Sequence, residues 1–555
     1  MKSNIFIKTA MVALIVLSGL SCDTQGFRDL DLPKYRLTVE NADMSMMFTR
    51  TIIDYGRGYI GGNPNNLESF VLKYHASYSI NSAFGSINQF TSGINDSWWG
   101  QYNSGLVNIA TLEDYLLKLD DPNQVNNIAM IQILKCAIFQ KMTDFYGDVP
   151  YRESSQLALS AFELNKPSYD TQEYIYKDIL QVLEREAANI TTSSAVMSST
   201  WTGADLAYAG NMEQWRKFAY SLMLRMAMRM SDVEPDLAKR YAELAISQGV
   251  IVVNADNYLM KCGTATSPDA RNTYSSWHRT GDQERYNKLG EYYVNWLKDK
   301  KHPVRKVLFG GRLKQSVPST QVSSSYMSRY WWDESMWDWD LDEAEGMIHG
   351  TLTNPKSSVA EYHKSFTSPN PFYYIDERPI ELLTASEVLL LIAEAAAKGW
   401  NTGSYSAESA FEAGVRANMT LLSGYPGLLK TDTPSKDYPN MHITEQEMDD
   451  YIAANPLGSD YATQKRRIAE EMWIMFYTNP CEGMFNYIRM NPTWFLLPLN
   501  ADFYPQFRRH AYPQNERTNN YEKLVEAMTK RGMSLEITRE NEMLERNWWD
   551  VTAKK

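Results

Sequence analysis

One short stretch of the chain combines the residue types that could recognise a sugar. Sugar rings present apolar C–H faces that stack on aromatic planes, and carboxylates accept hydrogen bonds from sugar hydroxyls. Four of the fifteen Trp of the chain fall within nine residues here, and several acids lie among them. This aromatic segment, residues 330–345, predicts an oligosaccharide site in which aromatic contacts come from Tyr330, Trp331, Trp332, Trp337 and Trp339, and hydroxyl contacts from Asp333 and Asp338.

A further tryptophan, Trp277, lies upstream in a similar stretch rich in polar and aromatic residues. We include it in the candidate site. The alternative is that these tryptophans attach an irregular loop to the body of the protein and touch no ligand. Each tryptophan taken singly fits that alternative well, because large aromatic side chains often anchor loops.

The acids of the segment alternate in sequence, as they do at the start of a calcium-binding loop. An EF-hand loop counted from Asp338 needs Gly at its sixth place and Glu at its twelfth, where this chain has Glu343 and His349. We therefore exclude an EF-hand and expect no cofactor. A looser structural calcium site remains the alternative to a solvated acidic loop formed by Asp338, Asp340, Asp342, Glu343 and Glu345.

No catalytic motif supports an enzymatic function in place of binding. The chain contains no HExxH, GxSxG or P-loop motif, and its seven His show no spacing typical of metal ligands. Cys136, Cys262 and Cys481 are far apart and form no CxxC pair. We expect a protein that is not an enzyme.

Composition and charge narrow the class further. The 555 residues are 44% hydrophobic and 22% charged, which is typical of a folded protein and excludes general disorder. Acids outnumber bases, 67 to 55, for a net charge of −12. A protein that binds nucleic acid through charge needs basic patches, so we expect no nucleic-acid partner.

The N-terminus has the pattern of a secretory signal. Lys2 and Lys8 precede an apolar run from Ala10 to Leu20, which is too short to cross a bilayer, and small residues lead to Cys22. This order predicts a lipoprotein signal peptide over residues 1–21, lipidation of Cys22 and a tether over residues 22–40. The alternative is an ordinary signal peptide followed by a chance Cys.

Hydrophobic spacing predicts a mainly α-helical body. Apolar residues recur at three- and four-residue steps, the period of one helix face. Thr384 and Glu387 have the spacing of a capping box, and Gly399 marks the end of the same helix. Helical periodicity lapses over about 249–379, where Gly, Pro, Ser, Thr and aromatic residues accumulate and a variable, loop-rich region with short strands is expected.

Several motifs spread along the chain resemble one family, the SusD/RagB nutrient-binding outer-membrane lipoproteins of Bacteroidetes, in particular its SusD-like branch. The similarity extends from Cys22 nearly to the end of the chain. The stretches that carry it are YGDVPYRE at 146–153, ADLAYAGNMEQWRKFAYSLMLRMAMR at 204–229, LLTASEVLLLIAEAAAKGW at 382–400, the QKR and WIMFYTNPCEGMFNYIR pieces within 464–489, and RRHAYPQNERTNN at 508–520.

The resemblance implies a single domain over residues 41–555 with a SusD-like fold, in which irregular tetratricopeptide-like helical hairpins pack against a variable loop-rich half. It implies a lipid anchor at Cys22 in the outer membrane, facing the extracellular side. It also implies a partner, a SusC-like TonB-dependent barrel to which the protein delivers captured oligosaccharides. Arg225 and Arg229 lie in a scaffold motif, where buried or interhelical contacts are expected. The family shares no ligand motif, so no binding residue is carried over.

Two other functions remain open. The protein could bind peptides or another nutrient in place of sugars. It could also act as a lid or adaptor of the transporter without binding a free ligand of its own.

Overall fold

A computed structural model of the protein divides into two compact units, Met1–Met44 and Ser45–Lys555. Nearly all of the described structure belongs to the second unit. The structure describes residues 43–59, 67–76, 98–154, 166–192, 199–263, 271–272, 288–318, 337–346, 364–370, 377–425, 441–490, 508–534, 537 and 539–551.

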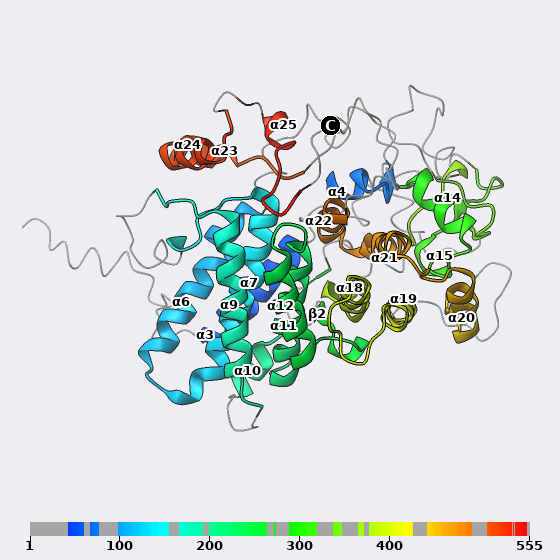
Figure 1. Cartoon of the computed structure of the whole chain (residues 1–555). Helices are drawn as coiled ribbons and strands as arrows, with labels where there is room; N and C mark the ends of the chain where they lie inside the picture. Colours follow the sequence, from blue (N-terminus) through cyan, green and yellow to red (C-terminus); the bar gives the residue numbers. More distant parts are fainter. Residues whose placement is uncertain are drawn as a thin grey trace, which may run out of the picture. The chain divides into compact units, whose positions relative to one another are not determined.

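Helices dominate the described part, which confirms the predicted fold class (Figure 1). Among the described residues, no helix is both long enough and apolar enough to cross a membrane. The longer helices are α3 (Met44–Tyr59), α6 (Gly105–Lys118), α7 (Val125–Tyr146), α9 (Gln172–Asn189), α11 (Met212–Arg229), α12 (Pro235–Gln248), α18 (Ala385–Ala397), α19 (Ala407–Ser423), α20 (Glu445–Ala454), α21 (Tyr461–Met475) and α22 (Pro480–Met490).

Helices that follow one another along the chain pack together. Helix α6 packs on α7, α7 on α9, α9 on α11, and α11 on α12. The second series pairs α18 with α19 and α21 with α22, and α18 contacts both α11 and α21. Repeated helical hairpins joined through α18 therefore form the body of the protein.

The hairpin of α18 and α19 shows how local sequence sets the helix ends. The Thr384 side chain caps α18 by accepting the Glu387 backbone N–H, as predicted. The second hydrogen bond of the predicted capping box, from the Thr384 backbone N–H to the Glu387 side chain, is wrong. Both carboxylate oxygens of Glu387 accept hydrogen bonds from Arg225 instead. The two helices approach closely at Gly414, where an added Cβ would lie 2.9 Å from Cγ of Leu390.

A methionine-rich face of α11 lies in the core. Leu222, Met226 and Met230 are fully buried there. Phe218 stacks on Tyr258 with ring centroids 3.9 Å apart. The burial of this face confirms the helical spacing predicted from the sequence.

Shorter helices and 3₁₀ turns lie between the longer helices and near the C-terminus. They are α4 (Leu67–Val71), α10 (Ser199–Ala204), α14 (Glu291–Asp299), α15 (Arg305–Leu308), α23 (Gln514–Asn519), α24 (Tyr521–Lys530), α25 (Arg539–Glu542), and the 3₁₀ turns η2 (Trp99–Asn103), η3 (Pro122–Gln124), η4 (Asn254–Asp256) and η9 (Phe476–Thr478).

The described strands form antiparallel pairs that join segments distant in sequence. The pairs are β1 (His75–Ala76) with β3 (Lys288–Leu289), β2 (Tyr258–Met260) with β6 (Ile380–Leu383), and β4 (Arg312–Leu313) with β5 (Trp337–Asp338). The β4–β5 pair matters most here, because β5 belongs to the aromatic segment.

Candidate functional site

The described end of the aromatic segment begins as a strand. In β5, Trp337 pairs with Leu313 and Asp338 pairs with Arg312. Leu313 is buried, so β4 belongs to the core and offers a fixed edge to β5. The backbone of the predicted site is therefore positioned by a strand pair at this point.

Gly311, just before β4, allows the segment to come close. It has φ +78°, a left-handed conformation that favours glycine. A Cβ at this position would lie 2.5 Å from the Asp338 carbonyl oxygen and 3.5 Å from the Trp339 ring. Any larger residue at position 311 would push the segment away.

Two arginines face the acids of the segment. Arg305 donates to Asp342 at 3.0 Å. Arg312 lies 3.7 Å from Asp338, 3.7 Å from Glu343 and 3.8 Å from Glu345, with its own side chain 17% exposed. Since these three distances exceed hydrogen-bonding range, Arg312 acts on the acids through charge.

The far end of the segment is attached by backbone contacts. Glu345 exchanges two hydrogen bonds with Thr367, from its N–H to Oγ1 at 3.0 Å and from the Thr367 N–H to its carbonyl at 2.7 Å. Lys298 donates to the buried Ala344 carbonyl at 2.8 Å. Between the two ends, Asp340 closes a turn by accepting the N–H groups of Asp342 and Glu343.

The structure places only part of the predicted site. Asp338 is the last residue of β5 and Trp339 follows it, and both residues are partly exposed. For Trp337 the backbone alone is described. Tyr330, Trp331, Trp332, Asp333 and Trp277, like the lipidation residue Cys22, lie outside the described residues, so their roles stay predictions.

The sequence did not mark Gly311, Arg305 and Arg312 as part of the candidate site. Arg305 and Arg312 are not near the acids in sequence. The Gly-Gly-Arg order at 310–312 was the available signal, because paired glycines often mark a close backbone approach.

Calcium is not supported by any cluster that the structure describes. Within the described ranges, no three His, Cys, Asp or Glu side chains come together in an arrangement that could hold a metal ion. Arg312 places a guanidinium among three of the acids that the calcium alternative would use. A structural calcium ion stays a weak hypothesis.

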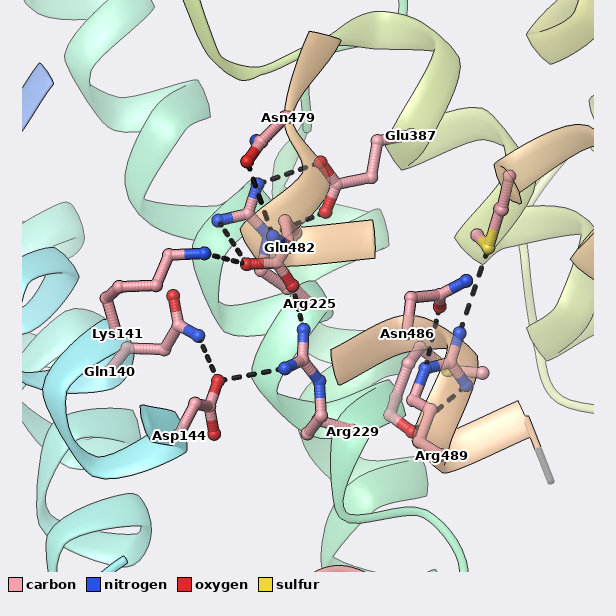
Figure 2. Close-up of polar contacts among 12 residues, drawn as sticks. Gln140, Lys141, Asp144, Arg225, Arg229, Glu387, Asn479, Glu482, Asn486 and Arg489 are labelled. Atoms are coloured by element: carbon pink, nitrogen blue, oxygen red, sulfur yellow. Dashed lines mark hydrogen bonds and ion pairs between the residues drawn. The ribbon is translucent and has the colours of Figure 1, made fainter. Parts of the chain in front are cut away.

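A second polar cluster lies inside the helical body (Figure 2). Lys141, Arg225 and Arg229 converge on Glu482, with Lys141 at 2.8 Å and Arg225 at 3.7 Å. Arg225 also forms a bidentate ion pair with Glu387, and Arg229 pairs with Asp144. We call this set of side chains the buried ion network: Lys141, Asp144, Arg225, Arg229, Glu387 and Glu482. These contacts confirm that Arg225 and Arg229 serve the scaffold.

The buried ion network is balanced and closed to solvent. Three cations face three carboxylates, and each side chain is at most 5% exposed. Burial lowers the pKa of Lys141 well below its usual value, and the positive charges of Arg225 and Arg229 add to that effect. Such a cluster binds helices to one another and offers no room to a ligand.

A cavity of about 310 Å³, including the part open to solvent, lies beside β6, the start of α18, the end of α19 and η9. The enclosed part of this space is about the size of one water molecule. Glu381 in its lining is 4% exposed and pairs with Arg378 at 3.1 Å. The other polar residues of the lining are Thr384, Glu387, Asn418, Thr478 and Asn479.

The SusD-like family model, described as starch-binding and associating with the outer membrane, matches residues 37–513. The chain belongs to this SusD-like family. None of the curated proteins compared with it matches.

Solved SusD-like structures share the fold. A chitin-binding protein superimposes with a TM-score of 0.71 at 23% identity over 92% of this chain and 100% of its own. A chitin-binding SusD homologue from Flavobacterium johnsoniae gives 0.65 at 20% identity over 92% and 99%. A SusD homologue from Bacteroides thetaiotaomicron gives 0.65 at 20% identity over 91% and 99%.

Proposed function

We propose that the protein is a surface-exposed lipoprotein that captures oligosaccharides and delivers them to a SusC-like TonB-dependent transporter of the outer membrane. The observation that carries this proposal is the family match over residues 37–513, whose description names starch binding and the outer membrane. Two structural neighbours titled as chitin-binding proteins add support for a glycan.

The described part of the aromatic segment supplies suitable chemistry. Asp338 keeps 45% of its side chain exposed, so its carboxylate can accept sugar hydroxyls. Trp339 follows it, partly exposed and fixed beside Gly311. A stacking ring next to a carboxylate on an anchored strand is a preorganised sugar contact, because little conformational freedom is lost on binding.

Membrane attachment and transport belong to the same proposal. Lipidation of Cys22 would tether the protein to the outer membrane, on the extracellular side. A SusC-like barrel would then receive the sugar from the bound lipoprotein. We propose no catalytic step, and incubation with a glycan panel should release no product.

The decisive experiment titrates the chain from Asp23 onward with polysaccharides and oligosaccharides, using calorimetry and tryptophan fluorescence. A Trp331/Trp332 double-Ala variant and Trp339→Ala should each weaken binding. Trp400→Ala is the matched control, since Trp400 is another partly exposed Trp, near Lys398 at the end of α18. Equal binding by all variants would move the site elsewhere.

Absence of binding across the glycan panel would overturn the oligosaccharide proposal. A peptide panel would then test the nutrient alternative. Co-purification of the transporter, retained in variants that lose sugar binding, separates a binder from an adaptor. Loss of the transporter complex in the same variants would favour the adaptor.

A further inference from the structure

We propose that Arg312 is a positioning residue for the sugar site, holding the described part of the aromatic segment, residues 337–345, on β4 by neutralising its acids. This inference rests on the proposed function of that segment. It assigns to Arg312 no direct contact with the sugar.

The contacts of Arg312 all lead to the segment. Its guanidinium faces Asp338 at the start of the turn and Glu343 and Glu345 at its end. One side chain of β4 thus links both ends of the Asp340 turn. Its 17% exposed side chain is more shielded than the acids, which are 45%, 70% and 64% exposed.

Charge explains why such a residue is needed. Five acids lie between positions 338 and 345, and like charges so close together repel one another. Among the described residues, Arg305 pairs with Asp342. Without Arg312, three carboxylates would lose the positive charge that faces them and would push the turn away from β4.

Other described contacts attach the segment at single points. The β4–β5 ladder pairs two residues on each strand, and further contacts lie at Asp342, Ala344 and Glu345. The intervening turn is bound by its own Asp340 hydrogen bonds, which do not connect it to β4. Arg312 is therefore the side chain of β4 that links both ends of this turn to the strand through charge.

Hydrogen–deuterium exchange of the full chain in detergent tests the inference without any ligand. In Arg312→Gln, amides of residues 339–345 should exchange about three- to tenfold faster than in the wild type, because local opening becomes easier. Arg312→Lys should restore slow exchange, since charge at 3.7–3.8 Å matters here and the planar fork does not. Arg305→Gln is the control and should change exchange less.

The salt dependence of exchange provides a second test, because a role of Arg312 in packing alone would not depend on salt. At about 1 M NaCl the screening length falls to about 3 Å, so the difference between the wild type and Arg312→Gln should shrink. Exchange in Arg312→Gln equal to the wild type at low salt would overturn the inference. Failure of Arg312→Lys to restore it would also do so.

Sugar titration separates this inference from the proposed function. If the wild type binds a glycan, Arg312→Gln should raise the dissociation constant and Arg312→Lys should lower it again. Faster exchange with an unchanged dissociation constant would overturn the link to sugar binding. If the wild type binds no glycan, the proposed function fails, and the exchange data still decide whether Arg312 positions the segment.

Discussion

The buried ion network and the aromatic segment both pair basic with acidic side chains, but the first is buried and the second is exposed to solvent. In the network, Glu482 is 1% exposed and lies 2.8 Å from Lys141. In the segment, the acids around Arg312 are 45–70% exposed and lie 3.7–3.8 Å away. Burial makes each pair of the network indispensable, because an unpaired charge there cannot be solvated. Solvent makes each pair of the segment individually weak.

This difference suits a binding protein with a fixed body and an adaptable surface. The network joins α7, α11, α18 and α22 through contacts between residues far apart in sequence. The segment attaches to the body through a two-residue ladder and a few contacts at its far end. Under the proposed function, changes in the segment should therefore alter binding while the helical body stays folded.

The largest effect is expected for Glu482→Gln. The amide cannot neutralise Lys141, Arg225 and Arg229, so the free energy of unfolding should fall by about 3–5 kcal/mol. Urea unfolding followed by circular dichroism measures it. The control is Glu445→Gln, because Glu445 is 77% exposed and pairs with Arg416 on the surface. A loss below about 1 kcal/mol for Glu482→Gln would show that the network is not critical.

Next in size is a pH effect from His75, which is buried beside the Tyr477 hydroxyl at 3.0 Å. Burial lowers the pKa of His75 from 6.5 to about 4. Between these values the unfolded chain binds the proton and the folded protein does not, so stability falls as the pH drops from 6.5 to 4. The loss at pH 4 should reach about 3 kcal/mol.

His75→Gln should remove this dependence. Unfolding free energies measured at pH 7, 6, 5 and 4 should show a shallower decline in the variant than in the wild type. Parallel declines would mean that other groups set the acid sensitivity. The comparison concerns slopes, so a constant loss of stability in the variant does not affect it.

A moderate effect is expected where the C-terminal segment meets the network. The Trp549 indole donates to Asp144 at 2.9 Å, and its ring is 1% exposed. Trp549→Phe removes this bond but leaves Asp144 its contacts with Arg229 and Tyr176. The free energy of unfolding should therefore fall by about 1–2 kcal/mol. Trp548→Phe, on a partly exposed ring, is the control. Equal losses of unfolding free energy in the two variants would show that the hydrogen bond to Asp144 adds no stability of its own.

The helices were largely predictable from the sequence because their signals are local. Apolar spacing and the Thr384 cap gave α18 nearly its full length. The capping box failed at Glu387 because a tertiary contact competed with the local one, and that contact, Arg225, is remote in sequence. Burial of Arg225 and Arg229 could be inferred from their motif, but their partners could not.

The site was less predictable because its support is remote. The types and density of residues marked Asp338 and Trp339 as candidates, and the structure shows both partly exposed on one anchored stretch. Arg312 and Gly311 were missed, since nothing local connects them with residues in β5. Pairing of short strands depends on the rest of the fold, which a single sequence does not display.

The smallest effect is expected for Asp342→Asn, the same carboxylate-to-amide change as in Glu482→Gln. Asp342 is 86% exposed and pairs with Arg305 at 3.0 Å. Water can solvate either partner alone, so the free energy of unfolding should change by less than about 0.5 kcal/mol. A larger loss in urea unfolding would contradict the contrast drawn between the two regions. It would mean that the aromatic segment stabilises the folded body, and that loop variants with altered binding must be interpreted as changes in folding as well.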